Sequence, residues 1–399
     1  MIQILNNQTL IHSFIKALEL NLDNDFIALL AEELNKRNLT LNDKKIIGRN
    51  LHMSTLKIGV IGCGSIAQHR HLLEYAVNDA VEIAAVCDIV QERAEEIAEK
   101  YGAKAYTSYE ELLANKEIDA VSVCTPNYLH APISIAALNA GKHVLCEKPM
   151  ATSQQEAEAM IEAAKRNGKK LMIAHNQRFV SSHQKARKLI ENGEIGKIYS
   201  FRTAFGHGGP EGWSVEGKEG WFFQKEKAFI GAMGDLGVHK TDLIRYLLGE
   251  EVTEVAGFVE TSAKDFSDVD DNAVCVLKME SGIIGTLAAS WSYVGKEDNS
   301  TIIYGEKAIL RLEDDPTHSL VVQYQNGEVV KYELGKIQSN ESGGQVNSHI
   351  VEQFVNCVLH DTEPPVSGEE GMKSLQVILA ALESNETKKI ARVSTAVSV

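Results

Sequence analysis

The most informative stretch of the chain reads Lys57-Ile-Gly-Val-Ile-Gly-Cys-Gly-Ser-Ile-Ala67. Residues 57–61 are apolar and β-branched enough to form a buried parallel strand. A helical pattern follows from Ser65 to Val77, and the turn between the two has the spacing Gly62-x-Gly64-x-x-Ala67. The sequence therefore predicts a strand, a glycine turn and a helix in direct succession.

This spacing is typical of a turn that binds the pyrophosphate of a dinucleotide. Gly62 allows the tight turn, Gly64 lets a phosphate approach the backbone, and the small Ala67 lets helix and strand pack closely. The unpaired N–H groups at the start of the helix then face the anion. An ordinary strand–helix turn has the same outline, but we expect dinucleotide contacts at four positions, namely Gly62, Gly64, Ser65 and Ile66.

A second predicted strand, at 81–87, supports the dinucleotide interpretation because it ends at Asp88. A carboxylate at this position accepts hydrogen bonds from a ribose diol and repels a 2′-phosphate. The sequence thus favours NAD over NADP. NADP stays possible because Arg93 lies one turn further along the chain.

Length and charge limit the class of protein. With 399 residues the chain is long enough for two domains and an appendage, and 44% hydrophobic residues support a real core. The net charge of −15 argues against binding to nucleic acid. We expect no membrane partner, because no apolar run is long enough to span a bilayer and the first residues lack the pattern of a signal peptide.

The six cysteines include no CxxC pair, and four of them lie in or beside predicted core strands. We interpret them as small buried hydrophobic residues in a reducing cytoplasm. Neither a disulfide framework nor a metal site is expected.

The first 52 residues differ from the rest of the chain. Residues 10–18 and 26–34 each place their apolar side chains on one helical face, with a polar break at 21–24. The segment 4–40 resembles the sporulation checkpoint inhibitor Sda, a helical hairpin. The resemblance implies that residues 1–45 bind a sensor histidine kinase. A generic amphipathic hairpin, or upstream sequence joined to the reading frame at Met53, remains an alternative.

From Lys57 onward strands and helices alternate, which predicts a doubly wound parallel sheet of the Rossmann type. Ligands bind such sheets outside the carboxyl ends of the strands. The candidate residues are therefore those that follow the predicted strands, namely 62–65, Asp88, 125–127, 147–149 and 175–176.

Beyond Gly193 several strand-like runs follow one another without helical crossovers, which indicates a large, mostly antiparallel sheet. We expect three parts: a helical hairpin with its linker at 1–52, an NAD-binding Rossmann domain at 53–176, and a C-terminal α/β domain at 177–399 for substrate and oligomerisation.

Two further groups of residues carry acid–base chemistry. Lys148, in Glu147-Lys-Pro149 after a predicted strand, can place an ammonium near a substrate hydroxyl. Asp235 and His239 are four residues apart and share one helical face, where a carboxylate can orient an imidazole. Taken alone, these could also be a surface lysine, a helix-capping aspartate and a structural histidine.

The order of these motifs, with Thr125-Pro-Asn127, His130 and Ser367-Gly-x-x-Gly371, resembles the glucose–fructose oxidoreductase/inositol dehydrogenase/rhizopine catabolism (Gfo/Idh/MocA) family over about 57–393. The resemblance implies an NAD(P)-dependent dehydrogenase of a sugar, cyclitol or related polyol, assembled as a homodimer or homotetramer. It implies catalytic roles for Lys148, Asp235 and His239. It adds cofactor contacts at Thr125, Asn127, His130, Glu147 and Lys148, and a position near the substrate at Arg178.

Three functions compete at this point. The first is the dehydrogenase, with aromatic residues such as Trp221 against the sugar ring. The second is an NAD-dependent glycosidase on the same fold, which would recycle its cofactor without net reduction. The third is a regulator, either a sensor on this fold or a kinase inhibitor acting through the hairpin.

Overall fold

In a computed structural model the chain divides into two compact units, residues 1–55 and 56–399. The structure describes residues 55–335 and 348–394, and in the first unit only Leu10, Phe26, Leu29, Leu30, Glu33, Leu34, Lys36 and Arg37. Leu10, Leu30 and Leu34 are buried helical residues, as the hairpin prediction expects. The rest of the predicted hairpin and its linker lie outside the described residues.

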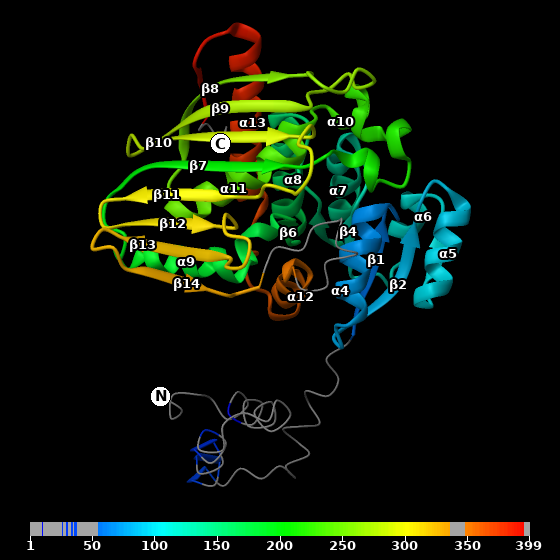
Figure 1. The fold of residues 1–399 in the computed structure, drawn as a ribbon. Helices are drawn as coiled ribbons and strands as arrows, with labels where there is room; N and C mark the ends of the chain where they lie inside the picture. The colour runs from blue at the N-terminus through cyan, green and yellow to red at the C-terminus, as the bar shows by residue number, and fades with distance from the viewer. Residues whose placement is uncertain are drawn as a thin grey trace. The chain divides into compact units, whose positions relative to one another are not determined.

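The second unit begins with a six-stranded parallel sheet, coloured blue to teal in Figure 1. Its strands lie in the order β3 (Lys104–Tyr106), β2 (Val81–Cys87), β1 (Leu56–Ile61), β4 (Ala120–Val123), β5 (His143–Cys146) and β6 (Leu171–Ile173). The connecting helices are η2 (Ala67–His71), α4 (Leu72–Ala76), α5 (Gln91–Tyr101), α6 (Tyr109–Ala114), α7 (His130–Asn139) and α8 (Gln154–Asn167). This is the strand order of a dinucleotide-binding Rossmann fold, so the predicted fold class is confirmed for this half.

Local sequence signals explain where these helices start and stop. Ser108 and Ser153 cap α6 and α8 by accepting hydrogen bonds from the backbone N–H groups of Glu111 and Glu156. At the end of α8, Gly168 adopts the left-handed conformation that a side chain would disfavour.

A nine-stranded, mostly antiparallel sheet forms the other half of the unit (Figure 1). Its strand order is β14 (Val329–Tyr332), β13 (Leu320–Tyr324), β12 (Ala308–Leu312), β11 (Thr301–Gly305), β7 (Ile198–Gly206), β10 (Ile284–Ser290), β9 (Asn272–Met279), β8 (Val252–Glu260) and β15 (Ala391–Arg392). Only β7 and β10 pair in parallel among its described strands. Helices α9 (Ser181–Glu191), α11 (Val238–Leu248) and α13 (Gly368–Thr387) pack on one face of this sheet.

The two halves are not strictly consecutive in the chain. Helix α12 (Ile350–His360) packs against α4 and β5, and its Ile350 and Phe354 belong to the hydrophobic core of the parallel-sheet half. Ser348 and Val351 also donate backbone hydrogen bonds to the buried side chain of Glu74 in α4. The chain therefore returns to the first half before α13 crosses to the second.

The elements that were not predicted include α9, β15, the 3₁₀ turn η4 (Asn176–Phe179) and the short helix α10 (Lys225–Ala228). The buried face of α9 consists of Ser182, His183, Ala186 and Leu189, so its apolar periodicity is weak. Strand β15 has two residues, which is too short to show an alternating pattern.

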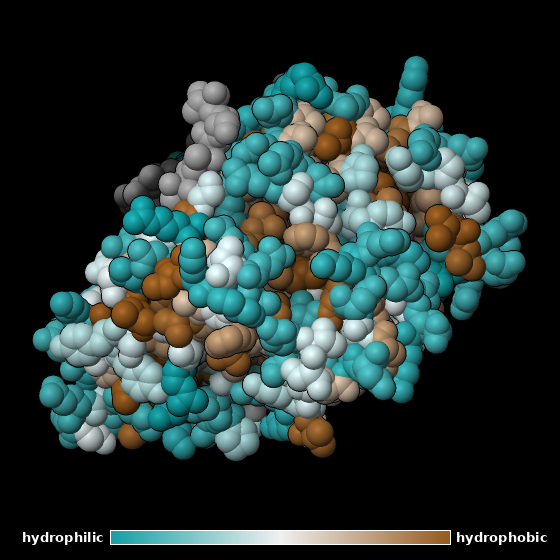
Figure 2. Space-filling view, turned by 90° about the horizontal axis from the view of Figure 1, so that it is seen from above, coloured by the Kyte–Doolittle hydropathy of each residue, from teal (hydrophilic) through white to brown (hydrophobic). Residues whose placement is uncertain are grey.

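No helix in the described part of the chain is long and apolar enough to cross a bilayer. On the face shown in Figure 2 hydrophobic residues form separate patches among hydrophilic ones.

Candidate active site

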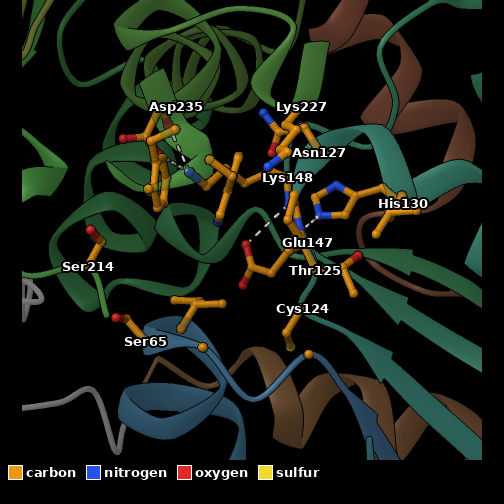
Figure 3. A pocket seen from close by; sticks show the side chains of 18 of the residues that line it. Ser65, Cys124, Thr125, Asn127, His130, Glu147, Lys148, Ser214, Lys227 and Asp235 are labelled. Carbon is orange, nitrogen blue, oxygen red and sulfur yellow. Dashed lines mark hydrogen bonds and ion pairs between the residues drawn. The ribbon is translucent and has the colours of Figure 1, made fainter. Parts of the chain in front are cut away.

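A cavity of about 570 Å³ lies at the carboxyl ends of the parallel strands, where both halves of the second unit contribute to its wall. The first half supplies the glycine turn and the residues that follow β2, β4 and β5. The second half supplies the end of β7, the 207–224 loop, and the helical segment that carries Asp235 and His239. Figure 3 shows these groups converging on the cavity.

The glycine turn forms one end of the cavity. Gly62 has φ +91°, and a Cβ there would lie 2.6 Å from the carbonyl oxygen of Cys124, so the turn requires glycine. A Cβ at Gly64 would meet no protein atom within 4 Å, which leaves its backbone open to a ligand. In the same wall, the buried hydroxyl of Thr125 has no hydrogen-bond partner among the described residues. An open backbone and an unpaired buried donor fit a dinucleotide.

Asp88 follows β2 and is almost completely buried at the cavity wall. Its carboxylate accepts hydrogen bonds of 2.9 Å from the backbone N–H groups of Cys63 and Val90. The guanidinium of Arg93 lies 3.3 Å from the same carboxylate. Asp88 thus fixes the shape of the glycine turn as well as lining the cavity.

The predicted cofactor residues after β4 and β5 all line the cavity and also hold its wall together. Asn127 donates a 2.8 Å hydrogen bond to the carbonyl of Ala228 in the second half. The two ring nitrogens of His130 lie 2.7 Å and 2.8 Å from the carbonyl oxygens of Pro149 and Thr125. The peptide bond between Lys148 and Pro149 is cis.

Glu147 is buried beside Arg70 and His71, and its Oε1 lies 2.9 Å from the Nε2 of His71. Burial alone would raise the pKa of Glu147. The hydrogen bond from His71 and the charges of Arg70, His71 and Lys148 outweigh burial and lower that pKa to about 2. Glu147 is therefore ionised throughout the neutral range.

Lys148 and Asp235 form the central ion pair of the site. The ammonium of Lys148 donates to Oδ1 of Asp235 at 2.6 Å and to its backbone carbonyl at 2.9 Å, as Figure 3 shows. The indole N–H of Trp291 donates to the other carboxylate oxygen at 3.1 Å. An ammonium has three donors, so one N–H of Lys148 remains for a ligand in the cavity.

His239 lies in the same wall and is 7% exposed as a residue. Its Nδ1 is buried without a hydrogen-bond partner among the described residues, so Nε2 is the ring nitrogen available to the cavity. Burial, and secondly the charge of Lys148, lowers the pKa of His239 well below its usual range. The imidazole is therefore neutral and able to accept a proton.

The expected contact between Asp235 and His239 is not formed, because both carboxylate oxygens of Asp235 are engaged by Lys148 and Trp291. Local helix geometry also separates the side chains of Asp235 and His239. Residues 233–237 form a π-turn, η8 (Met233–Gly237), which precedes α11 and shifts the side chains relative to a regular α-helix. Asp270 holds this turn by accepting hydrogen bonds of 2.7 Å from the backbone N–H groups of Gly231 and Met233.

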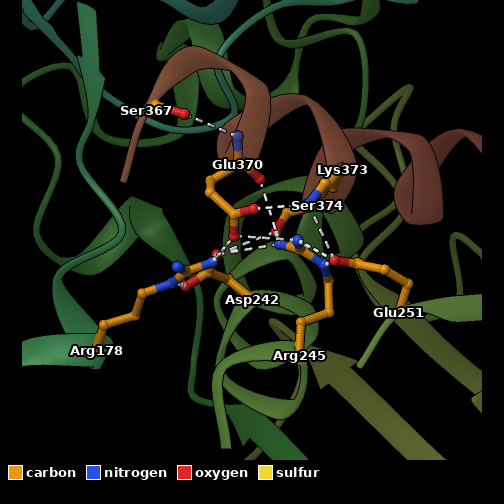
Figure 4. A network of polar contacts seen from close by, with 8 residues as sticks. All are labelled: Arg178, Asp242, Arg245, Glu251, Ser367, Glu370, Lys373 and Ser374. Atoms are coloured by element: carbon orange, nitrogen blue, oxygen red, sulfur yellow. Dashed lines mark hydrogen bonds and ion pairs between the residues drawn. The ribbon is translucent and has the colours of Figure 1, made fainter. Parts of the chain in front are cut away.

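The structure places Arg178, which was expected near the substrate, outside the lining of the cavity. Arg178 does not line the cavity, and its guanidinium is bound by Asp242 at 2.7 Å and by Glu370 at 2.9 Å. Figure 4 shows it in a network with Arg245 and α13. The turn η4 directs its neighbours Asn176 and Gln177 to the cavity instead.

Trp221 does line the cavity, where its ring stacks on Phe222 at a centroid distance of 3.9 Å. Other lining residues were missed from the sequence, namely His207, Trp291, Glu297 and Asn299. All lie at strand ends or in loops of the antiparallel sheet, where no motif marks them. Trp291 alone carried a signal in the sequence. It directly follows β10 and is one of only three tryptophans among the 399 residues.

Comparisons with known proteins agree with this architecture. Residues 56–175 match the model of an oxidoreductase family with an NAD-binding Rossmann fold, and 183–311 match the Gfo/Idh/MocA C-terminal domain. Residues 1–45 match sporulation inhibitor A, Sda, which confirms that resemblance.

Myo-inositol 2-dehydrogenase of Thermotoga maritima is 30% identical over 340 residues, covering 84% of this chain and 97% of the relative. D-glucoside 3-dehydrogenase of Escherichia coli is 29% identical over 354 residues, covering 84% of this chain and 96% of the relative. A solved structure of levoglucosan dehydrogenase with NADH has a TM-score of 0.76 and 26% identity, covering 86% of this chain and all of that one. The chain therefore belongs to the Gfo/Idh/MocA family of NAD-binding oxidoreductases.

Proposed function

We propose that this protein is an NAD-dependent dehydrogenase that transfers a hydride between a secondary alcohol of a sugar or cyclitol and nicotinamide. The observation that carries the proposal is the convergence of Lys148, Asp235 and His239 on one cavity whose other end is the glycine turn. The named relatives act on inositol and glucosides, which supports a ring-shaped polyol as substrate.

In this proposal the neutral His239 accepts the hydroxyl proton on Nε2. The remaining N–H of Lys148 donates to the substrate oxygen and stabilises its developing negative charge. Asp235 and Trp291 hold the ammonium in place. NAD, bound along Gly62, Gly64, Ser65, Ile66, Asp88, Thr125 and Asn127, supplies the hydride acceptor.

The aromatic wall gives the substrate pocket a surface for a sugar ring. Trp221 and Phe222 stack on each other, and the ring of Trp213 packs against the edge of Phe222 at 5.3 Å. The C–H face of a pyranose or cyclitol can pack against such rings while its hydroxyls bond polar groups. Asn176, Gln177 and Asn299 supply such polar groups in the same wall.

The test is a screen of sugars, cyclitols and sugar acids with NAD⁺, read as absorbance of the reduced cofactor. On the best substrate, Lys148→Met and His239→Gln should lose about 10²–10⁴-fold in kcat. Asp235→Asn should lose less, because the amide keeps a hydrogen-bond acceptor for Lys148. All three variants should still bind NAD in a fluorescence titration, and the exposed Lys116→Met serves as the matched control.

Normal kcat in His239→Gln, or loss of NAD binding in Lys148→Met, would contradict these roles. Turnover without net NADH, with the nucleotide retained through gel filtration, would favour the glycosidase instead. The absorbance screen therefore separates the two candidate reactions.

A second function concerns residues 1–45, because the Sda model matches them. We propose that this segment binds a sensor histidine kinase and inhibits its autophosphorylation. The assay is kinase autophosphorylation in the presence of the full chain and of a chain that begins at Met53. Equal kinase activity with both would remove this proposal.

A further inference from the structure

His239, the proton acceptor of the proposed reaction, has no hydrogen-bonded partner within the described part of the chain that would orient its imidazole. A histidine that acts through one ring nitrogen is normally fixed by a hydrogen bond at the other. Asp235 was expected in this role, but its carboxylate is bound to Lys148 and Trp291. The Nδ1 of His239 is left buried and unpaired among the described residues.

One polar ring, that of His175, contacts the imidazole of His239. Their ring centroids are 6.4 Å apart with the planes at 84°, while Phe205 contacts His239 with its ring at 5.9 Å. His175 comes two residues after β6, directly before η4, and is 1% exposed. Both of its ring nitrogens also lack partners in the described part of the chain.

His175 is neutral at ordinary pH. Burial lowers its pKa to about 4, with Asp242 acting in the opposite direction and Arg178, Arg245 and Lys148 acting in the same direction. A neutral imidazole has one donor and one acceptor, so it can take a hydrogen bond from one group and give one to another.

Three buried ring nitrogens without hydrogen-bond partners among the described residues destabilise the fold unless another group satisfies them. The centroid separation of 6.4 Å puts the two rings beyond direct hydrogen-bond reach. A single water hydrogen-bonded to one nitrogen of each ring spans a gap of this size, and an interior water needs two to four polar partners.

We propose that His175 positions the imidazole of His239 through a bridging water, so that Nδ1 of His239 carries its proton and Nε2 presents its lone pair to the substrate. This inference rests on the proposed acid–base role of His239. It makes His175 a positioning residue, because it does not line the cavity and acts only through His239.

The proposal predicts the direction in which the loss of His175 shifts the pKa of His239. When His239 accepts a proton, its Nδ1–H donates to the bridging water more strongly, which stabilises the imidazolium. Lys148, Arg70 and Lys240 oppose that charge, and so does His175 where it is itself protonated, below about pH 4. Removing His175 therefore lowers the pKa of His239 and moves the acidic limb of kcat/KM to lower pH, while the maximal rate falls.

The decisive variants are His175→Phe, which keeps the ring but removes both nitrogens, and His175→Gln, which keeps a donor and an acceptor at similar reach. We expect the first to lose about 10- to 100-fold in kcat, part of the 10²–10⁴-fold that a general base contributes. Its KM and NAD affinity should change less than about twofold. His175→Gln should recover most of the kcat and the wild-type acidic limb.

The matched control is His143→Phe. His143 is also a histidine whose pKa burial lowers to about 4, but it begins β5 at the end of the sheet away from the cavity. If His175→Phe does not fold, His175→Asn replaces it, since its amide is too short to reach the water.

Wild-type kcat and pH profile in the Phe or Asn variant, or a Gln variant as defective as Phe, would overturn the inference. An equal loss in His143→Phe would do the same. An inactive His239→Gln beside a normal His175→Phe would refute this inference alone. An active His239→Gln would refute the proposed function and, with it, this inference.

Discussion

Asp88 shows how one carboxylate can serve the fold and the ligand together. It accepts hydrogen bonds from Cys63 and Val90, and it holds the guanidinium of Arg93 at 3.3 Å. As long as Arg93 forms this ion pair, its guanidinium is not available to a 2′-phosphate. We therefore expect a preference for NAD over NADP that depends on both residues, mainly on the carboxylate.

Replacing Asp88 by Asn should release Arg93 and remove the repulsion of a 2′-phosphate. We expect kcat/KM with NADP to rise about tenfold or more. A tenfold rise corresponds to about 1.4 kcal/mol of interaction free energy. The NAD value should fall modestly, because one backbone hydrogen bond is weakened. Adding Arg93→Ala to this variant should abolish the gain, and comparable kcat/KM for both cofactors in the wild type would contradict the argument.

Lys240, next to His239, is fully buried and donates to the backbone carbonyl of Asn299 at 2.7 Å. Burial lowers its pKa from 10.5 to about 7. Between these values the unfolded chain binds a proton that the folded chain does not, so stability rises as pH increases from about 7 to 10. This increase of folding stability with pH arises from the single side chain of Lys240.

Lys240→Met should remove this increase of folding stability with pH. Melting temperatures at several pH values from 7 to 10 should rise less with pH in the variant than in the wild type, whatever the difference at any single pH. Lys142→Met is a useful comparison, because Lys142 is also held by backbone carbonyls, those of Asn115 and Ile118. Parallel pH curves for wild type and Lys240→Met would show that Lys240 stays charged in the fold.

At the level of elements, the sequence predicted what periodicity and turn chemistry can encode. The glycine turn, the parallel strands and the residues after them follow from local patterns, so the sequence alone predicts Gly62, Asp88, Lys148 and His239 as site residues, and all four line the cavity. The orientation of side chains was harder to predict. A π-turn separated Asp235 from His239, and a 3₁₀ turn directed Arg178 away from the cavity, because both depend on tertiary contacts such as those of Asp270 and Glu370.

The π-turn depends on glycine at 231. A Cβ there would lie 1.8 Å from the carbonyl oxygen of Asp270, which is backbone and cannot move aside easily. Gly231→Ala should cost about 3 kcal/mol of stability or more and reduce kcat, because it displaces the turn that carries Asp235. Gly212→Ala, with no atom within 4 Å of its Cβ, should leave the melting temperature unchanged. A stable Gly231→Ala would mean that this segment has room to shift.

On the scale of the whole molecule, the nine-stranded sheet has one face that none of the helices described within residues 56–335 and 348–394 covers. Phe258, Val274, Val276 and Ile284 are 44–64% exposed, and the strand register places all four on this face. Exposed apolar groups gathered on a flat sheet are typical of an interface. The expected homodimer or homotetramer would cover them.

Light scattering after gel filtration tests this assembly. The wild type should be a dimer or tetramer, and Val274→Glu combined with Val276→Glu should shift it toward the monomer, because charges would be buried unpaired in the interface. The control is Val77→Glu, at a position that is 72% exposed after α4. A monomeric wild type would contradict the prediction directly.

The first 55 residues form a compact unit of their own, and this predicts the effect of removing them. Within the described residues, both hydrophobic cores of the enzyme unit consist of side chains from Leu56 onward. A chain that begins at Met53 should therefore keep its melting temperature, its kcat and its NAD affinity. Differential scanning calorimetry and the NADH assay measure these on both chains. A melting temperature lowered by more than about 4 °C, roughly 1 kcal/mol or more, would show that the hairpin contributes to the stability of the enzyme.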